Sequence, residues 1–324
     1  MSEDTFTTLG EAAEAVVEKA AKKRAYGDGV YFGLEEDKYH ADTALGSTSI
    51  KTLAISPPDY WEGSPHNPDR EPDEDTPSRL FGRALHKLLL EGQDAFLTTY
   101  APTRHNGSTK DGKAERAVIA EEGQTAIRGD DFDRILKAGP AIRRNPDFDF
   151  AFSGGMPEVS IFWTRDGIRR KARIDYLKPR ASVDLKSVAN QKTREFPDAC
   201  RRAIGDFRYD VQAAHYNEAR EQLRALYAKG FVLGDHDETL FERIVGANTW
   251  SFVWMFYQTS GAPIAYGTYV NSGHALLDYG KATIARAEEN YRAYVDRFGL
   301  DNPWYLIEPM RELDIQDMPK WAFN

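Results

Sequence analysis

The chain has 324 residues, 41% of them apolar and 29% charged, a composition typical of a soluble globular protein with one large domain or two modest ones. Its single cysteine, Cys200, excludes a disulfide framework, a cysteine zinc site and an iron–sulfur cluster. No apolar run approaches the length of a bilayer span and the acidic start of the chain is not a signal peptide, so we expect a cytoplasmic protein.

The net charge of −9 argues mildly against nucleic acid as a partner, because phosphate binding requires lysine and arginine. The basic residues are nevertheless concentrated in residues 104–113, 165–180 and 201–208, away from the acidic stretches 35–37 and 71–75 and the acidic tail. A groove can be positive on an acidic protein. Charge alone therefore leaves DNA binding open.

The first predicted helix covers about residues 9–24, where Thr8 and Glu11 form a capping-box pattern and apolar residues recur at helical spacing. A break rich in glycine and aspartate follows at residues 27–29. Residues 57–77 are rich in proline, aspartate and glutamate, which predicts an exposed loop.

A second helix is predicted over residues 77–91. Thr76 is suited to cap it, Pro77 to occupy its first position and Gly92 to end it. Its buried side would carry Leu85, Leu88 and Leu89. Residues 101–129 are polar and basic, and we expect a partly mobile loop with a short helix there.

From Glu158 the apolar period changes from that of a helix to that of a strand. Residues 159–163 and 168–175 alternate in this way, and Asp166-Gly167 between them is a strong hairpin-turn dipeptide. A third strand is predicted over residues 181–186. The three strands form a meander.

A long helix over about residues 206–229, strands at 251–259 and 264–271, and an amphipathic helix at 276–298 complete the order of elements. This order predicts one mixed α/β domain over residues 30–324, with its core at about 150–275. Residues 1–29 would form an N-terminal helical extension.

The residues with the clearest chemistry are Asp175, Asp184 and Lys186. Because side chains alternate along a strand, Asp184 and Lys186 share one polar face, and Asp175 continues the polar face of the preceding strand. The two carboxylates can then converge on one metal ion, and hard oxygen ligands suit Mg²⁺ or Mn²⁺. The backbone carbonyl of Leu185 could add a ligand, and the Lys186 ammonium could stabilise charge on a reacting phosphate. The alternative is a surface ion pair at a strand end.

Flanking motifs resemble two nested nuclease groups. The RecB-like branch of the PD-(D/E)XK nucleases is matched, in order, by Gly82-Arg-Ala-Leu-His86, Ile174-Asp175, Asp184-Leu-Lys186 and Gln212-Ala-Ala-His-Tyr216. The N-terminal and C-terminal signatures of the exonuclease VIII (RecE-type) family are matched by Tyr39-His-Ala-Asp, Ser47-Thr-Ser-Ile-Lys51, Ser56-Pro-Pro-Asp-Tyr60, Trp304-Tyr and Met318-Pro-Lys-Trp321. The resemblance covers about residues 30–324.

The resemblance implies a restriction-endonuclease-like core, with a central mixed sheet flanked by helices and an N-terminal helical elaboration. It also implies that His86 binds the metal, that Glu158 assists the metal site, and that Gln212 and Tyr216 contact the DNA backbone or brace the Lys186 region. Each has a structural alternative: a packed or solvated histidine, a solvated acid at a strand end, and a helix surface with one half-buried tyrosine. His215 and Cys200 are expected to have packing roles.

Six basic residues are candidates for DNA contact. Arg169, Lys171 and Arg173 continue the strand face of Asp175 and could steer phosphates toward the metal, or could form a solvated strand face. Three others, in a loop rich in glycine, serine and threonine, are better placed for a flexible clamp on a strand end: Arg104, Lys110 and Lys113.

The resemblance therefore implies a metal-dependent exonuclease of phage-recombination type, which degrades linear duplex DNA from its ends. It further implies 5′→3′ polarity, 3′ single-stranded tails, a RecT-type annealing recombinase as partner, and a homo-oligomer, possibly a ring-shaped tetramer. Two alternatives remain: a PD-(D/E)XK endonuclease, and a catalytically silent DNA-binding scaffold of the same fold.

Overall fold

The computed structural model describes residues 26–71, 76–190 and 194–323, so the helix expected at 9–24 lies outside the described residues. The main sheet contains β1 (Gly29–Tyr31), β4 (Met156–Arg165), β5 (Ile168–Lys178), β6 (Ala181–Val188), β7 (Val232–Leu233), β8 (Ser251–Gln258) and β9 (Ala265–Asn271). Their spatial order is β7-β1-β4-β5-β6-β8-β9. β1 with β7 and β6 with β8 are parallel, and the other neighbours are antiparallel. The sheet is therefore mixed, as expected.

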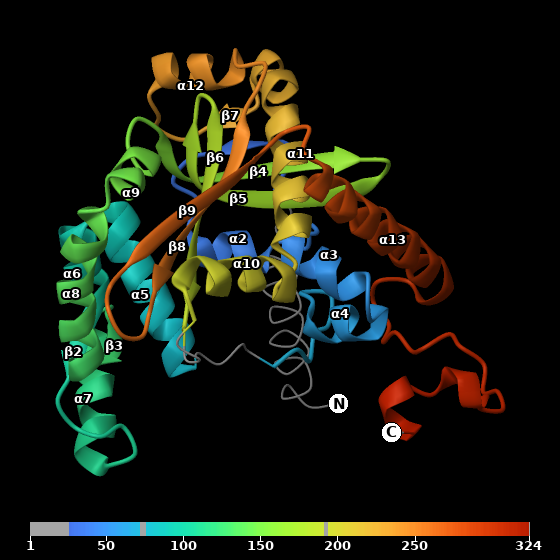
Figure 1. The fold of residues 1–324 in the computed structure, drawn as a ribbon, viewed down its shortest axis with the longest axis horizontal. Coiled ribbons are helices and arrows are strands. Elements are labelled where there is room, and N and C mark those ends of the chain that lie inside the picture. The colour runs from blue at the N-terminus through green and yellow to red at the C-terminus, as the bar shows by residue number, and fades with distance from the viewer. Residues whose placement is uncertain (1–25, 72–75, 191–193, 324) are drawn as a thin grey trace, which may run out of the picture.

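Helices cover both faces of this sheet (Figure 1). The N-terminal half contains α2 (Glu36–Ala41), α3 (Ser47–Leu53), α4 (Pro57–Gly63), α5 (Pro77–Glu91), α6 (Gln93–Thr99), α7 (Lys110–Glu121), α8 (Gly129–Arg143) and α9 (Pro146–Ala151). The C-terminal half contains α10 (Phe196–Asp206), α11 (Tyr209–Ala228), α12 (Glu238–Val245), α13 (Ala275–Phe298) and the 3-10 turns Ile315–Asp317 and Lys320–Phe323. None of the helices in the described ranges is long and apolar enough to cross a membrane.

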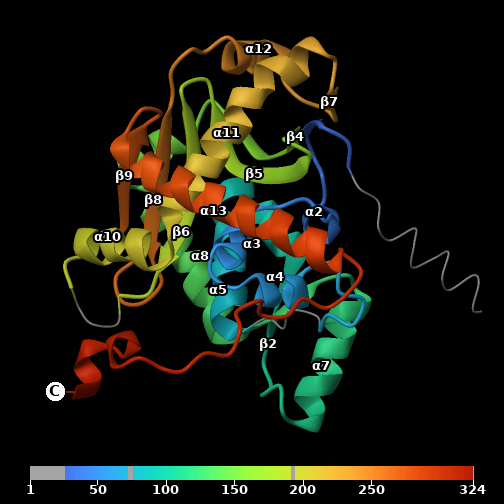
Figure 2. The same ribbon diagram turned by 90° about the vertical axis from the view of Figure 1, so that its right-hand side faces the viewer.

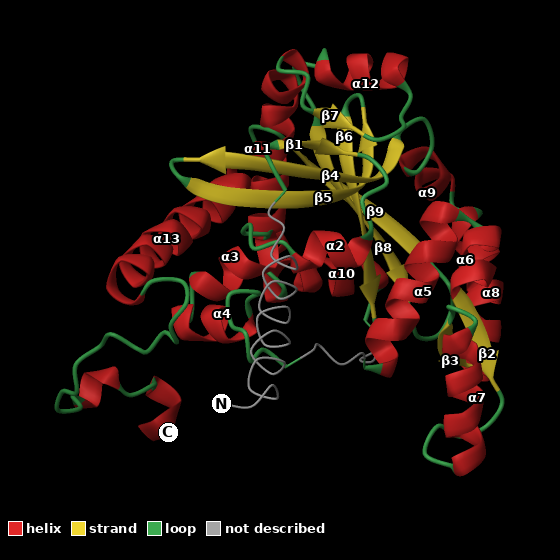
Figure 3. Cartoon of the chain, turned by 180° about the vertical axis from the view of Figure 1, so that it is seen from behind, coloured by secondary structure: helices red, strands yellow, loops and turns green. Residues whose placement is uncertain are grey.

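Two apolar layers hold the helices to the sheet. On one face, α5, α8 and α9 pack on β6 and β8 around Leu85, Val183 and Leu185. On the other face, α10, α11 and α12 pack around Ile174 and Phe252. Figure 3 shows the sheet between these layers, with α13 beside α11. Burial of these apolar faces is the main favourable contribution to folding.

The predicted helix over residues 77–91 is confirmed as α5. The Thr76 hydroxyl accepts a hydrogen bond from the Arg79 backbone N–H at 3.2 Å, and Pro77 occupies the first turn, where its missing N–H is not needed. Gly92 ends the helix with a φ of 93°, a conformation that favours glycine. Local sequence therefore determines both ends of α5.

The predicted meander is also confirmed, as β4, β5 and β6. Asp166 and Gly167 both have positive φ, 51° and 78°, as a two-residue hairpin turn of type I′ requires. The strands at residues 251–259 and 264–271 appear as β8 and β9, and the helices at 206–229 and 276–298 appear as α11 and α13.

Two expected loops are more regular than predicted. Residues 57–63 form α4, because Ser56 caps it and because Tyr60 and Trp61 are buried against the C-terminal part of the chain, where the Trp61 indole donates to the Leu300 carbonyl at 2.8 Å. Residues 101–129 contain α7 between β2 (Tyr100–Thr103) and β3 (Thr125–Arg128), which pair in parallel as a separate small sheet. That pairing joins residues distant in sequence, which local pattern does not reveal.

Beyond α13 the chain continues as an extended arm, which Figure 2 shows running away from the body of the domain. Trp304, at the start of the arm, is buried against Tyr60 and Tyr294. The remainder of the arm exposes large apolar side chains, including Met310 and Trp321.

A buried charge cluster joins the β4–β5 hairpin to α11 and α13. Arg170 is 1% exposed and contacts the carboxylates of Glu218 and Glu288. Arg165 reaches the same two carboxylates, and the Trp163 indole donates to Glu218 at 2.8 Å. Removing one partner from such a buried cluster leaves a charge without compensation.

Arg170→Met is therefore expected to lower the free energy of unfolding by about 3–5 kcal/mol. Urea unfolding followed by circular dichroism measures this loss. The matched control is Arg201→Ala, which removes an exposed arginine paired with Asp198 and should cost less than about 1 kcal/mol. An unchanged unfolding midpoint for Arg170→Met would show that the cluster contributes little.

Candidate active site

The site lies where β5 and β6 separate. The two strands are paired from Tyr176 to Lys178 and from Ala181 to Val183, and beyond that point β6 continues only alongside β8. Asp175 is the first β5 residue past the paired segment, and its Oδ2 accepts a hydrogen bond from the Leu185 backbone N–H at 2.7 Å. The Asp175 carboxylate thus takes the place of the next backbone hydrogen bond between β5 and β6. The fork, the point where β5 and β6 separate, determines the position of this carboxylate.

Asp184 and Lys186 point to the α11 face of the sheet. Lys186 Nζ lies 2.7 Å from Asp184 Oδ2, and Gln212 on α11 donates to Asp184 Oδ1 at 2.7 Å. The Lys186 ammonium also lies 4.9 Å from the centre of the Tyr209 ring. Asp184 is 1% exposed, so both of its oxygens lie in a nearly dry environment.

His86 and Glu158 approach Asp175 from the other elements of the site. His86, on α5, lies 3.1 Å from Asp175 Oδ2 through Nε2 and 3.9 Å from Glu158 Oε1 through Nδ1. Glu158 has a left-handed φ of 53°, which is uncommon for a residue other than glycine and is found preferentially where the surrounding structure imposes it. Its other oxygen accepts from Arg173 Nε at 2.6 Å.

Burial and the neighbouring charges raise the pKa of two acids of the site and lower that of the third. Burial raises the pKa of Asp184 to about 6, although the Lys186 ammonium opposes this change. Burial and the neighbouring Asp175 raise the pKa of Glu158. Burial also acts to raise the pKa of Asp175, but His86 and Lys186 outweigh it and hold the value below the ordinary range.

The two basic groups respond to the same carboxylates. Burial alone would lower the pKa of Lys186, but Asp184 and Asp175 outweigh it and the net shift is upward. The pKa of His86 is likewise raised, because Asp175 outweighs the effect of burial. Lys186 is therefore a firmly charged ammonium at neutral pH.

These residues fit a divalent cation. Among the described residues, His86, Glu158 and Asp175 offer three ligand atoms that all lie within 4.8 Å of one another. Buried Asp184 Oδ2 has no hydrogen-bond partner in good geometry within the described ranges, despite the nearby ammonium. Carboxylate oxygens with one imidazole suit Mn²⁺ and Mg²⁺. The compact trio includes Asp175 but not Asp184, and the convergence of the two aspartates on one metal ion stays a prediction.

Of the remaining predicted site residues, Gln212 contacts Asp184, whereas others pack in the apolar layers. Gln212 braces Asp184 directly, whereas Tyr216, one turn later, is buried and packs against Phe252. The Leu185 side chain faces the opposite apolar layer. The roles of Tyr216 and of the Leu185 carbonyl stay predictions. His215 is fully buried beside Trp163, in agreement with the expected packing role.

The structure places the basic face of β5 against the segment around α2. The Lys171 ammonium is buried and donates to the carbonyls of Tyr39 and Asp42, both at 2.7 Å. Arg169 pairs with Asp42 at 3.0 Å. Arg173 contacts Glu158 and the carbonyl of Leu34. The segment around α2 folds over this face and these side chains anchor it, while Arg169 keeps a side-chain exposure of 30%. Their contact with DNA phosphates stays a prediction.

The second basic group lies on another part of the molecule. Lys110 and Lys113 are exposed on α7, and Arg104 is exposed just after β2. Figure 1 shows α7 at the end of the molecule farthest from β7 and α12. Arg104 donates its backbone N–H to Glu115, which positions the turn before α7. Contact of these three residues with DNA stays a prediction.

Lys51 and Tyr209 lie near Lys186 and were not predicted as part of the site. Lys51 on α3 lies 5.4 Å from the Tyr209 ring centre, and burial and Lys186 lower its pKa to about 8. No local signal connects α3 to the first residue of α11, because the contact is tertiary. By contrast, Arg79, Arg83 and Lys87 line the same groove as His86, and helical spacing along α5 would have revealed them.

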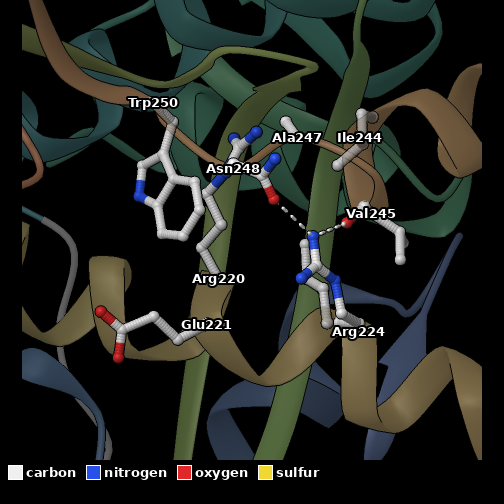
Figure 4. A pocket seen from close by; sticks show the side chains of 9 residues that line it. Arg220, Glu221, Arg224, Ile244, Val245, Ala247, Asn248 and Trp250 are labelled. Carbon is white, nitrogen blue, oxygen red and sulfur yellow. Dashed lines mark hydrogen bonds between the residues drawn. The ribbon is translucent and has the colours of Figure 1, made fainter.

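A groove of about 1790 Å³ surrounds these residues and is bounded by α2, α3, α5, β4, β6 and α11. A separate cavity of about 180 Å³ lies between α11 and α12 (Figure 4). There Arg224 donates to Val245 and Asn248, and Trp250 faces Arg220. Since no group of potential metal ligands among the described residues lies there, the large groove is the candidate active site.

The forked mixed sheet, its flanking helices and the Asp-x-Lys strand define the PD-(D/E)XK class of nuclease fold. The chain belongs to the family of PDDEXK-like domains of unknown function (DUF3799), whose sequence model matches residues 46–244. A crystal structure described as a "putative exonuclease" from Eubacterium rectale is similar, with 16% identity and a TM-score of 0.51 over 81% of this chain and 88% of that chain. The comparison with curated proteins gave no significant match.

The pKa of Asp184 predicts a pH dependence of metal binding. The carboxylate must be ionised to bind a cation, and a raised pKa means that this form is lost as pH falls through about 6. The affinity for Mn²⁺ should therefore be lower at pH 5 than at pH 7.5, by about tenfold or more, and protonation of His86, whose pKa is also raised, acts in the same direction.

Isothermal titration of Mn²⁺ at several pH values measures this change. Asp184→Asn is the control, because any pH dependence that persists in it belongs to His86 or another ligand. A Mn²⁺ affinity that is the same for the wild type at pH 5 and pH 7.5 would contradict the role of Asp184.

Proposed function

We propose that this protein is a metal-dependent DNA exonuclease that hydrolyses phosphodiester bonds from the ends of linear duplex DNA. The observation that carries the proposal is the pairing of buried Asp184 with the Lys186 ammonium, beside the trio of His86, Glu158 and Asp175. Membership of a PDDEXK-like family supports the nuclease chemistry. The structural neighbour's description supports the exonuclease assignment.

The protein groups have distinct tasks in this reaction. Asp184, Asp175, Glu158 and His86 would hold a divalent cation, which supplies Lewis-acid activation of water and of the scissile phosphate. Lys186 stays charged, so its ammonium can orient the attacking water and stabilise the negative charge that develops on the phosphate.

Positioning of these groups comes from the surrounding contacts. Gln212 fixes the orientation of Asp184 by its 2.7 Å hydrogen bond. The Tyr209 ring confines the Lys186 ammonium from the α11 side. Because both contacts exist before substrate binds, little reorganisation is needed at the moment of reaction.

The groove also offers an electrostatic basis for binding DNA. The α5 wall that carries His86 also carries Arg79, Arg83 and Lys87, which line the groove. Positive side chains along one wall can attract phosphates although the whole chain has a net charge of −9. Acidic residues also line the groove, among them Asp235, Asp237 and Glu91, which pairs with Lys87 on α5 at 2.8 Å.

Lys186→Met is expected to lower kcat about 10²- to 10³-fold, because one preorganised donor to the developing charge is lost. Asp184→Asn should lower it by at least as much. The assay uses end-labelled linear duplex DNA with Mg²⁺ or Mn²⁺, and Asp198→Asn, which alters an exposed acid on α10, is the matched control.

Full activity of Asp184→Asn would overturn the assignment of the site. A covalently closed circular duplex tests the exonuclease assignment in the same assay. An exonuclease leaves that circle intact, whereas nicking of the circle by the wild type would instead indicate an endonuclease. A wild type that releases no nucleotides would favour a DNA-binding scaffold.

We also propose the finer RecE-type properties, which rest on the sequence motifs alone. These are 5′→3′ digestion that leaves 3′ tails, a RecT-type annealing recombinase as partner, and a homo-oligomer such as a ring-shaped tetramer. With 5′ and 3′ labels compared, the 5′ label should be released first. Sedimentation equilibrium should show a mass of several times 36.6 kDa, and a monomer would contradict the ring.

A further inference from the structure

Two aromatic rings lead outward from Lys186 to the surface. The Tyr209 ring is in contact with the Lys186 ammonium, at 4.9 Å from its centre. The Phe207 ring stacks on Tyr209 with a centroid distance of 5.7 Å and an interplanar angle of 26°. Tyr209 lines the groove, whereas Phe207 is 60% exposed. A flat apolar surface therefore begins at the candidate catalytic lysine and ends in solvent.

The backbone between the two rings is held in an unfavourable conformation. Arg208 has a φ of 50° and a ψ of 52°, the left-handed region that a residue with a large side chain seldom occupies. Its guanidinium is bound to both oxygens of Asp210, at 3.0 and 2.9 Å, and to Thr283 Oγ1 at 2.8 Å. The Phe207 carbonyl accepts from Lys51 at 2.8 Å.

These contacts come from three elements, α3, α11 and α13, and together they fix the projecting position of Phe207. An ordinary helix connection has no need of such restraint, and strain of this kind is found preferentially at binding sites. The hydrogen bond from Lys51 to the Phe207 carbonyl places the connection between α10 and α11 beside α3.

The charges beside the rings match a phosphate backbone. The Lys51 and Lys186 ammoniums lie 5.4 and 4.9 Å from the Tyr209 ring centre. Lys186 pairs with Asp184 and Arg208 pairs with Asp210, which leaves Lys51 as the cation beside the rings without a carboxylate partner among the described residues. Single-stranded nucleic acid presents flat bases and regularly spaced negative charges, and proteins bind it with stacked aromatic rings beside lysine or arginine. A duplex interior offers no free base face to such a surface.

We propose that Phe207 and Tyr209 form a stacking platform for an unpaired nucleobase of the DNA strand being cleaved, with Lys51 binding a neighbouring phosphate. This inference rests on the proposed nuclease function and specifies its substrate: the site takes a strand end whose bases are unstacked from the duplex. Continuity with Lys186 favours a nucleobase as the occupant of the exposed ring over an apolar peptide or a second copy of the chain.

The test measures binding of a short single-stranded DNA that contains 2-aminopurine, whose fluorescence is quenched by stacking. EDTA is present so that no bond is cleaved. Phe207→Ala should weaken binding about 5- to 100-fold, as expected for the loss of one stacked base, and should abolish the quenching. Phe207→Trp should keep both properties, whereas Phe207→Leu keeps the bulk but loses the aromatic face and should behave like Phe207→Ala.

Phe150→Ala is the matched control, because Phe150 is exposed on α9, outside the residues that line the groove. If Phe207→Ala and Phe150→Ala bind the strand equally, the platform is excluded. The platform is also excluded if the wild type binds the strand without quenching, or does not bind it. Self-association that is lost in Phe207→Ala while quenching is unchanged would assign the ring to a second copy instead.

The nuclease assay separates this inference from the proposed function. If the wild type degrades linear DNA and Phe207→Ala leaves strand binding unchanged, the platform fails and the nuclease assignment stands. If the wild type degrades nothing yet Phe207→Ala loses quenching and binding, the platform stands as a single-strand binding site and the nuclease assignment fails.

Discussion

The separation of β5 from β6 is the constraint on which the site depends. Where two antiparallel strands part, the backbone groups of both lose their partners, and a buried unpaired group is costly. Asp175 meets this requirement by accepting the Leu185 N–H. The same bond places a carboxylate at the fork, one residue from Asp184 on the neighbouring strand. The hydrogen bond between Asp175 and the Leu185 N–H therefore both stabilises the sheet and positions the Asp175 carboxylate.

Charge balance is the second constraint. Three carboxylates, those of Glu158, Asp175 and Asp184, lie near the Lys186 ammonium, the His86 imidazole and the Arg173 guanidinium in a largely buried site. Burial is the main cause of the raised pKa values of Glu158 and Asp184, and the neighbouring Asp175 carboxylate adds to it. A divalent cation would favour the ionised form of both carboxylates, which links metal binding to the ionisation of the site.

The basic residues of β5 illustrate how the surrounding chain changes the meaning of a motif. Arg169, Lys171 and Arg173 were predicted to steer DNA because they share a face with Asp175. In the structure they hold the segment around α2 by its carbonyls and by Asp42, and so close the groove on that side. They shape the site through these contacts, and Lys171 and Arg173 also line the groove. Arg79 and Arg83 line it from α5.

The sequence by itself determined the elements whose signals are local: the caps of α5, the Asp166-Gly167 hairpin, and the alternation that separates Asp184 and Lys186 from Val183 and Leu185. Ordered motifs added His86 and Gln212, which the structure brings against Asp175 and Asp184. Only the tertiary structure decided that β6 runs parallel to β8 and that Asp175 is grouped with His86 and Glu158. It also brought Lys51 and Tyr209 together beside Lys186. These contacts join residues far apart in the chain, and their free energy comes from burial and charge pairing that no local pattern encodes.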